Sequence, residues 1–201
     1  DTTSTTHSQT NSTHASIAQL VTAVADTLMQ HGWMLTTAES CTGGLIAGHC
    51  TDLAGSSQWF ERGFVTYSNE AKHDMLGVDN AILTEHGAVS EPTAQAMALG
   101  ALRHSRAQVS IAVTGVAGPT GGSKDKPVGT VWFAVAWTWE KISGKSSPVA
   151  PPAETPEGEP TALGFGAHVP FGPMLAIAAA LYFLFLRSWV GAWFADLAVL
   201  F

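Results

Sequence analysis

Residues 36–47 read TTAESCTGGLIA. They follow an apolar segment, so we predict a strand over 33–37, then a short turn and a helix over about 43–49. A hydroxyl in such a turn lies at the carboxyl edge of the sheet, where open α/β folds bind ligands. Gly43 and Gly44 allow close approach to the backbone, and the helix N-terminus offers N–H groups to a phosphate or an oxyanion. On spacing alone, however, most turns of this kind are only turns.

Helical and strand patterns alternate along residues 16–136. Apolar residues at helical spacing predict a first helix that begins after Ser16 and ends at Gly32. The segment Ser90-Glu91-Pro92 predicts the start of another helix, which runs to about His104. Further strands are predicted at 64–67, 108–113 and 128–136, with a Gly-rich loop at 115–122. This alternation is typical of the α/β class and predicts a three-layer α/β/α sandwich.

The composition limits the kinds of partner. The chain has 201 residues, enough for one domain with appendages, and only 12% are charged, about half the usual share. The formal charge of -7 argues against nucleic-acid binding, which needs clustered Lys and Arg. Cys41 and Cys50 form neither a CxxC pair nor a zinc pattern, which fits a reducing compartment. The chain starts with Asp1 and not Met, so we expect its natural N-terminus upstream.

The regions on either side of this domain differ in composition. Residues 1–15 are rich in Ser and Thr, and we expect them to be disordered. Residues 137–160 become rich in Pro, Ser and Glu, which is typical of a linker. The remainder, 161–201, is an apolar tail. Within it, 169–186 is an uncharged run of 18 residues, long enough to predict a membrane helix, although a buried helix of a soluble core stays open.

Two further segments carry candidate chemistry. The segment YSNEAK, residues 67–72, ends in a lysine that would act as a general base only when burial or a nearby cation keeps it neutral. The plain alternative is a solvated surface charge. The segment TGVAGP, residues 114–119, follows a strand as a phosphate-cradling loop would, but it lacks the ending of a P-loop. The eight histidines form no HxxxH pair, so we predict neither a metal site nor a cofactor.

Taken together, these segments resemble the CinA C-terminal family in order and spacing. The resemblance is carried by TTAESCTGGLIA (36–47), TDLAGSSQWFERGFVTYSNEAKHDMLGV (51–78), HGAVSEPTAQAMALGAL (86–102) and GVAGPTGGSKDKPVGTVWFAVA (115–136). It implies an α/β/α fold with a mixed sheet. It also implies that the carboxamide of nicotinamide mononucleotide (NMN) is hydrolysed to nicotinate mononucleotide and ammonia, a step of NAD salvage in the pyridine nucleotide cycle.

The resemblance also implies roles for single residues. Ser40 falls where the family has its nucleophile, and Lys72 where it has its proposed base. The candidate substrate contacts are Glu39, Thr42, Gly43, Gly44, Tyr67, Thr114, Gly115 and Gly118. The chemistry agrees, because amide hydrolysis needs a nucleophile, a proton shuttle for ammonia and an oxyanion site, and the N–H groups after Ser40 are suited to the last. Cys41 is the rival nucleophile.

The resemblance stops after Ala136. The family continues with another strand, an arginine near the substrate phosphate and a closing helix, and we expect all three to be missing. Residues from about 155 instead resemble the C-terminal end of type IV prepilin peptidases, whose last membrane span begins as GAHVPFGP (166–173) does. The paired aspartates of those peptidases are absent, so their activity is not expected. We interpret the chain as a chimera of two unrelated fragments.

Three interpretations of function follow. The first is an NMN amidase with a cytoplasmic catalytic domain, which the missing part can impair and for which membrane attachment through residues 169–186 stays open. The second is an inactive nucleotide-binding module on the same membrane attachment. The third, a membrane-assembly fragment, leaves the motifs around Ser40 and Lys72 unexplained. The expected partner is a small-molecule nucleotide and not nucleic acid, while membrane association and a homo-oligomer stay open.

Overall fold

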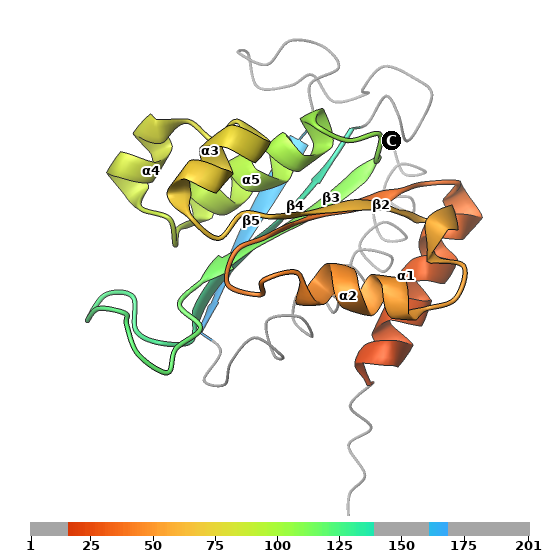
Figure 1. The fold of residues 1–201 in the computed structure, drawn as a ribbon, viewed down its shortest axis with the longest axis horizontal. Helices are drawn as coiled ribbons and strands as arrows, with labels where there is room; N and C mark the ends of the chain where they lie inside the picture. Colours follow the sequence, from red (N-terminus) through yellow and green to blue (C-terminus); the bar gives the residue numbers. More distant parts are fainter. Residues whose placement is uncertain (1–15, 139–160, 169–201) are drawn as a thin grey trace, which may run out of the picture.

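The computed structural model describes residues 16–138 and 161–168, which form a mixed five-stranded sheet with helices on both faces (Figure 1). The strands are β1 (Leu35–Glu39), β2 (Phe60–Val65), β3 (Val109–Gly115), β4 (Thr130–Trp137) and β5 (Thr161–His168). Their order is β2-β1-β3-β4-β5. Strand β1 runs parallel to β2 and β3, whereas β4 is antiparallel to β3 and to β5. The carboxyl ends of β1, β2 and β3 therefore meet at one edge.

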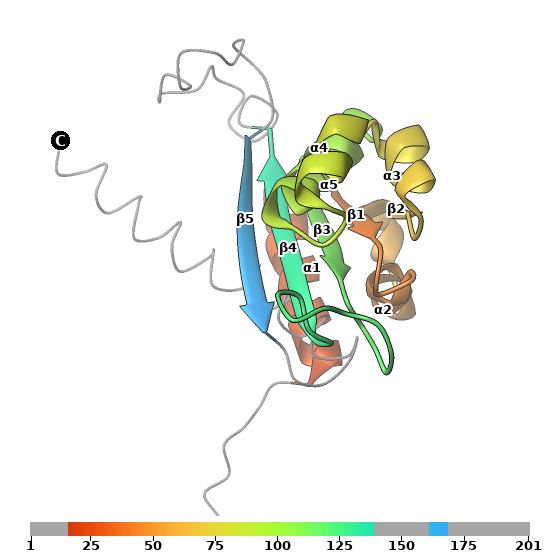
Figure 2. The ribbon, with the colours of Figure 1, turned by 90° about the vertical axis from the view of Figure 1, so that its left-hand side faces the viewer.

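The helices form the two outer layers. They are α1 (Ile17–His31), α2 (Leu45–Asp52), α3 (Asn69–Leu76), α4 (Asn80–His86) and α5 (Glu91–Arg103), with a 3₁₀ turn, η1 (Ser56–Gln58). Helices α1 and α2 cover one face of the sheet, and α3, α4 and α5 lie on the other (Figures 1 and 2). The predicted mixed-sheet α/β fold is confirmed, with helices in the two outer layers that the alternating pattern predicted.

Alternation along the strands builds two cores. In β1, Leu35 packs with Ile46 of α2 on one face, whereas Ala38 packs with Met97 of α5 on the other. This is the two-residue period of a strand that is covered on both faces. The face beneath α5 is lined largely by alanines, which let the helix lie close to the sheet: Ala38, Ala112, Ala134 and Ala136 from the strands, and Ala94, Ala98 and Ala101 from α5.

The capping signals placed the two longest helices correctly. Ser16 caps α1 in a capping box with Gln19, and Gly32 ends that helix in the left-handed conformation. Ser90 caps α5, and its side chain accepts from the Thr93 N–H. The strands were predicted less well. Strand β1 starts and ends two residues later than predicted, and β2 starts at Phe60 rather than at residue 64.

The expectation that the last strand is missing is wrong. Residues Thr161–His168, which we assigned to the tail, form β5 and pair with β4 from Thr130↔His168 to Trp137↔Thr161 (Figure 2). Without β5, the edge of β4 would leave backbone N–H and C=O groups unpaired. Residues 161–168 contain no Pro, Asp, Glu, Lys or Arg, and their backbone pairs with these groups. The predicted boundary at residue 161 therefore falls at the start of a sheet strand.

The other terminal predictions concern residues outside the described part of the chain. These are the disordered segment 1–15, most of the linker 137–160, and the apolar helix at 169–186 with its prepilin-peptidase resemblance. Among the helices described, none has both the length and the apolar character needed to cross a bilayer. Membrane attachment therefore stays a prediction.

Two glycines test the close packing of α5. A Cβ on Gly100 would lie 2.1 Å from the Leu76 carbonyl oxygen of α3, whereas a Cβ on Gly48 of α2 would meet nothing within 4 Å. We expect Gly100→Ala to lower the free energy of unfolding by about 1–3 kcal/mol through overpacking. Gly48→Ala should be neutral or stabilising by up to about 1 kcal/mol through helix propensity. Urea denaturation of both variants measures the difference, and equal midpoints would contradict it.

Candidate active site

Ser40 is the first residue after β1, at the carboxyl edge of the sheet. Its N–H donates to the Val113 carbonyl (2.9 Å), and its own carbonyl accepts from the Gly43 N–H (3.1 Å). Continued from β1, the strand alternation directs Ser40 to the face that carries α3 and α5, the same face as Ala38. The side chain is nearly buried, with 7% of its surface exposed. The serine hydroxyl is therefore held in a fixed turn.

Lys72 reaches Ser40 from α3. Its Nζ lies 3.0 Å from Ser40 Oγ, 2.9 Å from the Thr66 carbonyl oxygen and 3.2 Å from that of Tyr67. The Ser68 side chain caps α3 by accepting from the Ala71 N–H, which fixes where this helix starts. The structure thus brings together the predicted nucleophile and the predicted base, and Lys72 is not the solvated surface charge of the alternative interpretation, because it is fully buried.

The environment of Lys72 favours the neutral amine. Burial lowers the pKa of Lys72, against the smaller opposite effects of Cys41 and Glu70. No described Asp or Glu forms an ion pair with it. A neutral amine has two N–H groups and one lone pair. Three backbone carbonyl oxygens accept from Nζ, those of Thr66, Tyr67 and, at 3.4 Å, Ser68, and Nζ also lies within donating distance of Ser40 Oγ. In the neutral form, two N–H groups serve two of these carbonyls and the lone pair can accept from the Ser40 hydroxyl.

Glu39, a predicted substrate contact, directs its carboxylate into the protein. Its side chain is fully buried on the α2 side of the sheet. Oε2 accepts from Thr42 Oγ1 (2.7 Å) and from the N–H groups of Gly44 and Ile46 (both 3.0 Å). Oε1 accepts from the Ala47 N–H (2.8 Å) and from Thr37 Oγ1 (3.3 Å). Five donors occupy the carboxylate, so its oxygens are committed to contacts inside the protein.

Two predicted contact residues also use their hydroxyls inside the protein. Thr42 donates to Glu39, and Thr114 donates to the Ala88 carbonyl (2.7 Å). Both side chains are buried, which places them behind the site. Tyr67, by contrast, is 77% exposed next to the carbonyls that hold Lys72. Of the predicted polar contacts, Tyr67 alone presents its side chain to solvent and so to a ligand.

The predicted glycines line the same edge of the sheet. Gly43 and Gly44 have φ values of 59° and 97°, which suit glycine in the tight turn after Ser40. Gly115 ends β3, and a Cβ there would lie 2.7 Å from the Thr130 carbonyl oxygen. Gly118 has a φ of 80° in the loop that follows. These positions leave the backbone accessible at the edge where Ser40 lies.

The turn after Ser40 retains two N–H groups for a ligand. Among the described residues, the Thr42 N–H has no acceptor, and the Cys41 N–H has none beyond its own thiol. The N–H of the residue after a nucleophile is a common member of an oxyanion site. The α2 N-terminus, which the sequence suggested for phosphate, is instead filled by Glu39.

Cys41 is chemically suppressed. Burial raises the pKa of the Cys41 thiol to about 11, and the nearby Glu39 carboxylate adds to the rise. The thiol is therefore protonated at neutral pH, whereas a nucleophilic cysteine needs its thiolate. Ser40, which has a buried amine within hydrogen-bond distance, stays the predicted nucleophile.

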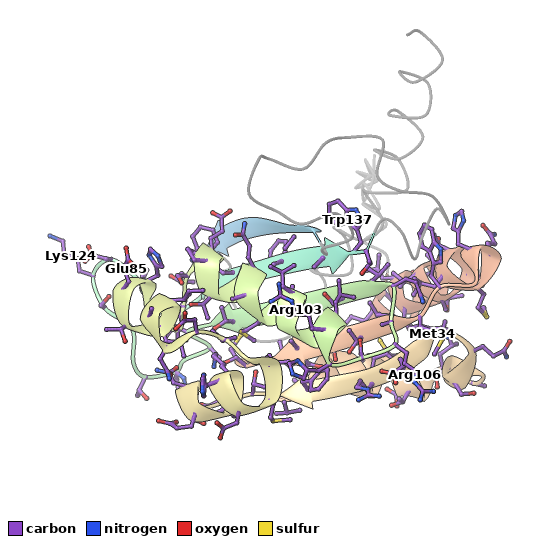
Figure 3. The ribbon with its side chains drawn as sticks, turned by 90° about the horizontal axis from the view of Figure 1, so that it is seen from above. Met34, Glu85, Arg103, Arg106, Lys124 and Trp137 are labelled. Atoms are coloured by element: carbon purple, nitrogen blue, oxygen red, sulfur yellow. The ribbon has the colours of Figure 1, made fainter. Side chains whose placement is uncertain are left out.

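The Gly-rich loop after β3 borders the same edge. Figure 3 places Lys124 of this loop and Glu85 of α4 at the end of the sheet opposite Met34 and Arg106. Met34 and Arg106 precede β1 and β3, so the loop lies at the carboxyl end. Lys126 donates to the His86 carbonyl (2.9 Å), which ties the loop to the C-terminus of α4.

Sequence reasoning missed the part played by Thr66. Its carbonyl accepts from Lys72, and its N–H donates to the Glu39 carbonyl (2.8 Å), so it links Lys72 to β1. Its hydroxyl and that of Thr130 are buried without a hydrogen-bond partner among the described residues. The signal available was position alone, because Thr66 comes just before the YSNEAK segment at the end of a strand.

The fold and the site define a class of protein: a mixed-sheet α/β domain with a buried Ser–Lys pair, of the kind that serine hydrolases use. The chain belongs to the CinA C-terminal domain family, whose family model matches residues 17–146.

Relatives within the family carry informative names. The chain is 57% identical over 124 residues to a nicotinamide-nucleotide amidohydrolase, PncC, of Escherichia coli K12, covering 62% of this chain and 75% of the relative. A PncC of Enterobacter agglomerans is 57% identical over 118 residues, covering 59% and 72%. A putative competence-damage inducible protein of Symbiobacterium thermophilum is 60% identical over 114 residues, which cover 57% of this chain and 27% of that protein.

Solved structures show the same fold. The competence/damage inducible protein CihA of Agrobacterium tumefaciens superposes with a TM-score of 0.71 at 41% identity, covering 86% of this chain and 96% of that one. A CinA superfamily protein of Escherichia coli gives a TM-score of 0.67 at 34% identity, covering 84% and 86%.

The buried amine should make folding stability depend on pH. At pH values between the lowered pKa of Lys72 in the folded chain and its ordinary value of 10.5, the unfolded chain binds more protons than the folded chain. The free energy of unfolding should therefore rise with pH in this window. Below this window both states are protonated, and burying the charge destabilises the fold most. We expect Lys72→Met to remove this rise, as measured by urea denaturation at several pH values.

The matched control is Lys124→Met, which changes an exposed lysine. It should retain the rise in stability of the unsubstituted chain. An identical pH dependence in the unsubstituted chain and Lys72→Met would show that Lys72 does not titrate abnormally.

Proposed function

We propose that the chain hydrolyses the carboxamide of nicotinamide mononucleotide to nicotinate mononucleotide and ammonia. The observation that carries this proposal is the 3.0 Å separation of Lys72 Nζ and Ser40 Oγ in a buried site. Relatives at 57% identity named nicotinamide-nucleotide amidohydrolases supply the substrate class. The reaction needs no cofactor, because the nucleophile, base and oxyanion donors are all groups of this chain.

The acylation half-reaction uses the neutral amine of Lys72. Lys72 takes the proton of the Ser40 hydroxyl while Oγ forms a bond to the carboxamide carbon. The carbonyl electron pair moves to oxygen, and the resulting oxyanion accepts from the N–H groups of Cys41 and Thr42. Protonated Lys72 then gives its proton to the departing nitrogen, and the C–N bond breaks. Ammonia is released, and the acyl group stays bound to Ser40 as an ester.

The second half-reaction releases nicotinate mononucleotide. Lys72, neutral again, takes a proton from a water molecule whose oxygen attacks the ester carbon. The C–O bond to Ser40 breaks, and the proton on Lys72 returns to Ser40 Oγ. One water molecule is consumed and one ammonia molecule is released, and the enzyme returns to its starting state.

The rest of the nucleotide would lie along the carboxyl edge of the sheet. We assign contact with the pyridine ring to exposed Tyr67, and close backbone approach to Gly43, Gly44, Gly115 and Gly118. After residue 136 the chain has a single arginine, Arg187, so the arginine-bearing segment of the family is not recognisable. We therefore assign the phosphate contact to Lys124 and Lys126, the lysines of the loop at this edge.

The alternative is an inactive nucleotide-binding module held at a membrane by residues 169–186. That segment lies outside the described residues, and self-association is likewise a prediction without support in the described part of the chain. Ammonia release from NMN by the full chain separates the two interpretations, since a module that only binds the nucleotide releases none.

Substitution of the two neighbouring nucleophiles gives the direct test. Ser40→Ala removes the attacking oxygen, and we expect kcat for NMN to fall on the order of 10³-fold or more. Cys41→Ala removes a thiol that is protonated at neutral pH, and we expect little change. Ammonia release in a coupled assay measures both. Turnover that survives in Ser40→Ala but is lost in Cys41→Ala would mean that Cys41, and not Ser40, is the nucleophile.

The proposed base predicts the shape of the pH profile. The lowered pKa of Lys72 means that the neutral amine becomes abundant below pH 10.5. We therefore expect kcat/KM to rise with pH and to level off once Lys72 has lost its proton. Lys72→Met should abolish turnover. Lys124→Met removes a proposed phosphate contact, so it should lower kcat/KM but leave the pH midpoint of the profile unchanged. A profile that is flat on the alkaline side of neutrality in the unsubstituted chain would contradict Lys72 as base.

A further inference from the structure

The Glu39 carboxylate occupies the place that many α/β proteins leave to a ligand anion. The N–H groups of Gly44, Ile46 and Ala47, at the start of α2, point at its two oxygens within 3.0 Å. Such N–H groups form a ready anion site when nothing fills them. Here the anion comes from the protein, from the strand residue just before Ser40.

We propose that Glu39 is a positioning residue for the reaction at Ser40. Its carboxylate holds the turn 40–44 so that the N–H groups of Cys41 and Thr42 are presented to the substrate carbonyl. It also keeps the substrate phosphate away from the α2 N-terminus. This proposal deepens the amidase function given above and rests on it.

The side chains of Glu39 and Ser40 do not face each other, because residues alternate between the two faces along β1. Glu39 and Ser40 are consecutive, so their side chains lie on opposite faces of the sheet. Glu39 binds α2, whereas Ser40 meets Lys72 of α3. The carboxylate therefore acts on the site only through the backbone between them.

The turn itself is tied to Glu39 at two points. Oε2 accepts from Thr42 Oγ1 at 2.7 Å and from the Gly44 N–H at 3.0 Å, while the Ser40 N–H is held by Val113. These contacts fix the residues on both sides of the two N–H groups left for an oxyanion. An oxyanion site depends on donors that are already aligned, because no reorganisation is then needed during the reaction.

The local capping pattern sets this arrangement apart from an ordinary helix cap. The residue at the N-cap of α2 is Gly44, whose side chain supplies no hydrogen bond. Ser, Thr, Asp or Asn at that position would cap the helix locally. The capping group is instead the Glu39 carboxylate of β1. It therefore joins the helix, the strand and the turn after Ser40. All five partners are donors, which suits an ionised carboxylate, since it only accepts.

The same charge sets the direction in which a nucleotide binds. A phosphate at the α2 N-terminus would meet a buried carboxylate that already uses the N–H groups, and like charges repel strongly in a buried site. The phosphate must therefore lie away from Ser40, which leaves the carboxamide end of the molecule for the nucleophile.

The test uses the full chain with Glu39→Ala, alone and with sodium acetate. Acetate matches the two carbon atoms and the charge that the substitution removes. We expect kcat for NMN to fall at least about 100-fold in Glu39→Ala, as for the loss of an oxyanion donor, with KM changed far less. Saturable recovery of kcat with acetate, absent with sodium chloride, supports the proposal.

Matched variants control for general effects of acetate. Glu85→Ala removes an exposed carboxylate of α4 and should show wild-type kcat with no response to acetate. Lys72→Ala loses the base, so acetate should not restore it. Recovery of the melting temperature of Glu39→Ala by acetate without recovery of kcat would assign Glu39 a purely structural role and overturn the proposal. Wild-type kcat in a folded Glu39→Ala would also overturn it.

Glu39→Gln keeps the test open if Glu39→Ala does not fold. It preserves the size of the side chain but replaces one acceptor oxygen with a donor group that faces backbone N–H groups. We expect a folded protein by circular dichroism with a kcat lowered at least about tenfold and a similar KM. An unchanged kcat in Glu39→Gln would contradict a positioning role.

A second readout separates this proposal from the proposed function. A fluorophosphonate probe forms a bond to an activated serine without any need for NMN recognition, and mass spectrometry measures the rate at Ser40. If the unsubstituted chain releases no ammonia but is labelled, the proposed substrate is wrong while Glu39 is still testable. Labelling that slows in Glu39→Ala and recovers with acetate supports the positioning role, and equal labelling rates overturn it.

Discussion

The buried contact between Lys72 and Ser40 depends on how closely α5 lies on the sheet. Alanines beneath α5 allow that approach, and Gly100 lets the carbonyl of Leu76, at the C-terminus of α3, lie against the α5 backbone. Helix α3 is therefore supported by α5 and not only by its own short contact with β2. Since Lys72 lies in the middle of α3, the small residues between α3, α5 and the sheet help to set where its amine is placed.

The position of the Lys72 amine determines its protonation behaviour. An amine with no carboxylate partner among the described residues is expensive to bury in its charged form, and the surrounding backbone carbonyls accept hydrogen bonds from either form. The balance lowers the pKa of Lys72, which is why we propose this amine, and not a histidine, as the base for Ser40. The three layers bury the amine completely, which is the condition that lowers its pKa.

Local signals in the sequence gave the bounds of α1 and α5, because Ser16, Gly32 and Ser90 act within one helical turn. The pairing of Ser40 with Lys72 came from the resemblance to a family, since 32 residues separate the two. Neither source gave β5, which depends on pairing across a long connection, nor the cap that Glu39 supplies to α2. Both depend on contacts between elements that no local pattern contains.

Glu39 and Lys72 also distinguish the proposed nucleophile, Ser40, from its neighbour Cys41. Cys41 follows Ser40 directly and carries the more nucleophilic element, yet burial and the Glu39 carboxylate hold the pKa of its thiol near 11, against a weaker opposite effect of Lys72. Ser40, on the other face of the sheet, is shielded from that carboxylate by the backbone and faces the amine instead. A buried carboxylate and a buried amine on opposite sides of β1 thus disfavour the thiolate of Cys41 and place the amine beside the Ser40 hydroxyl. The proposed choice of nucleophile therefore follows from strand alternation as much as from residue type.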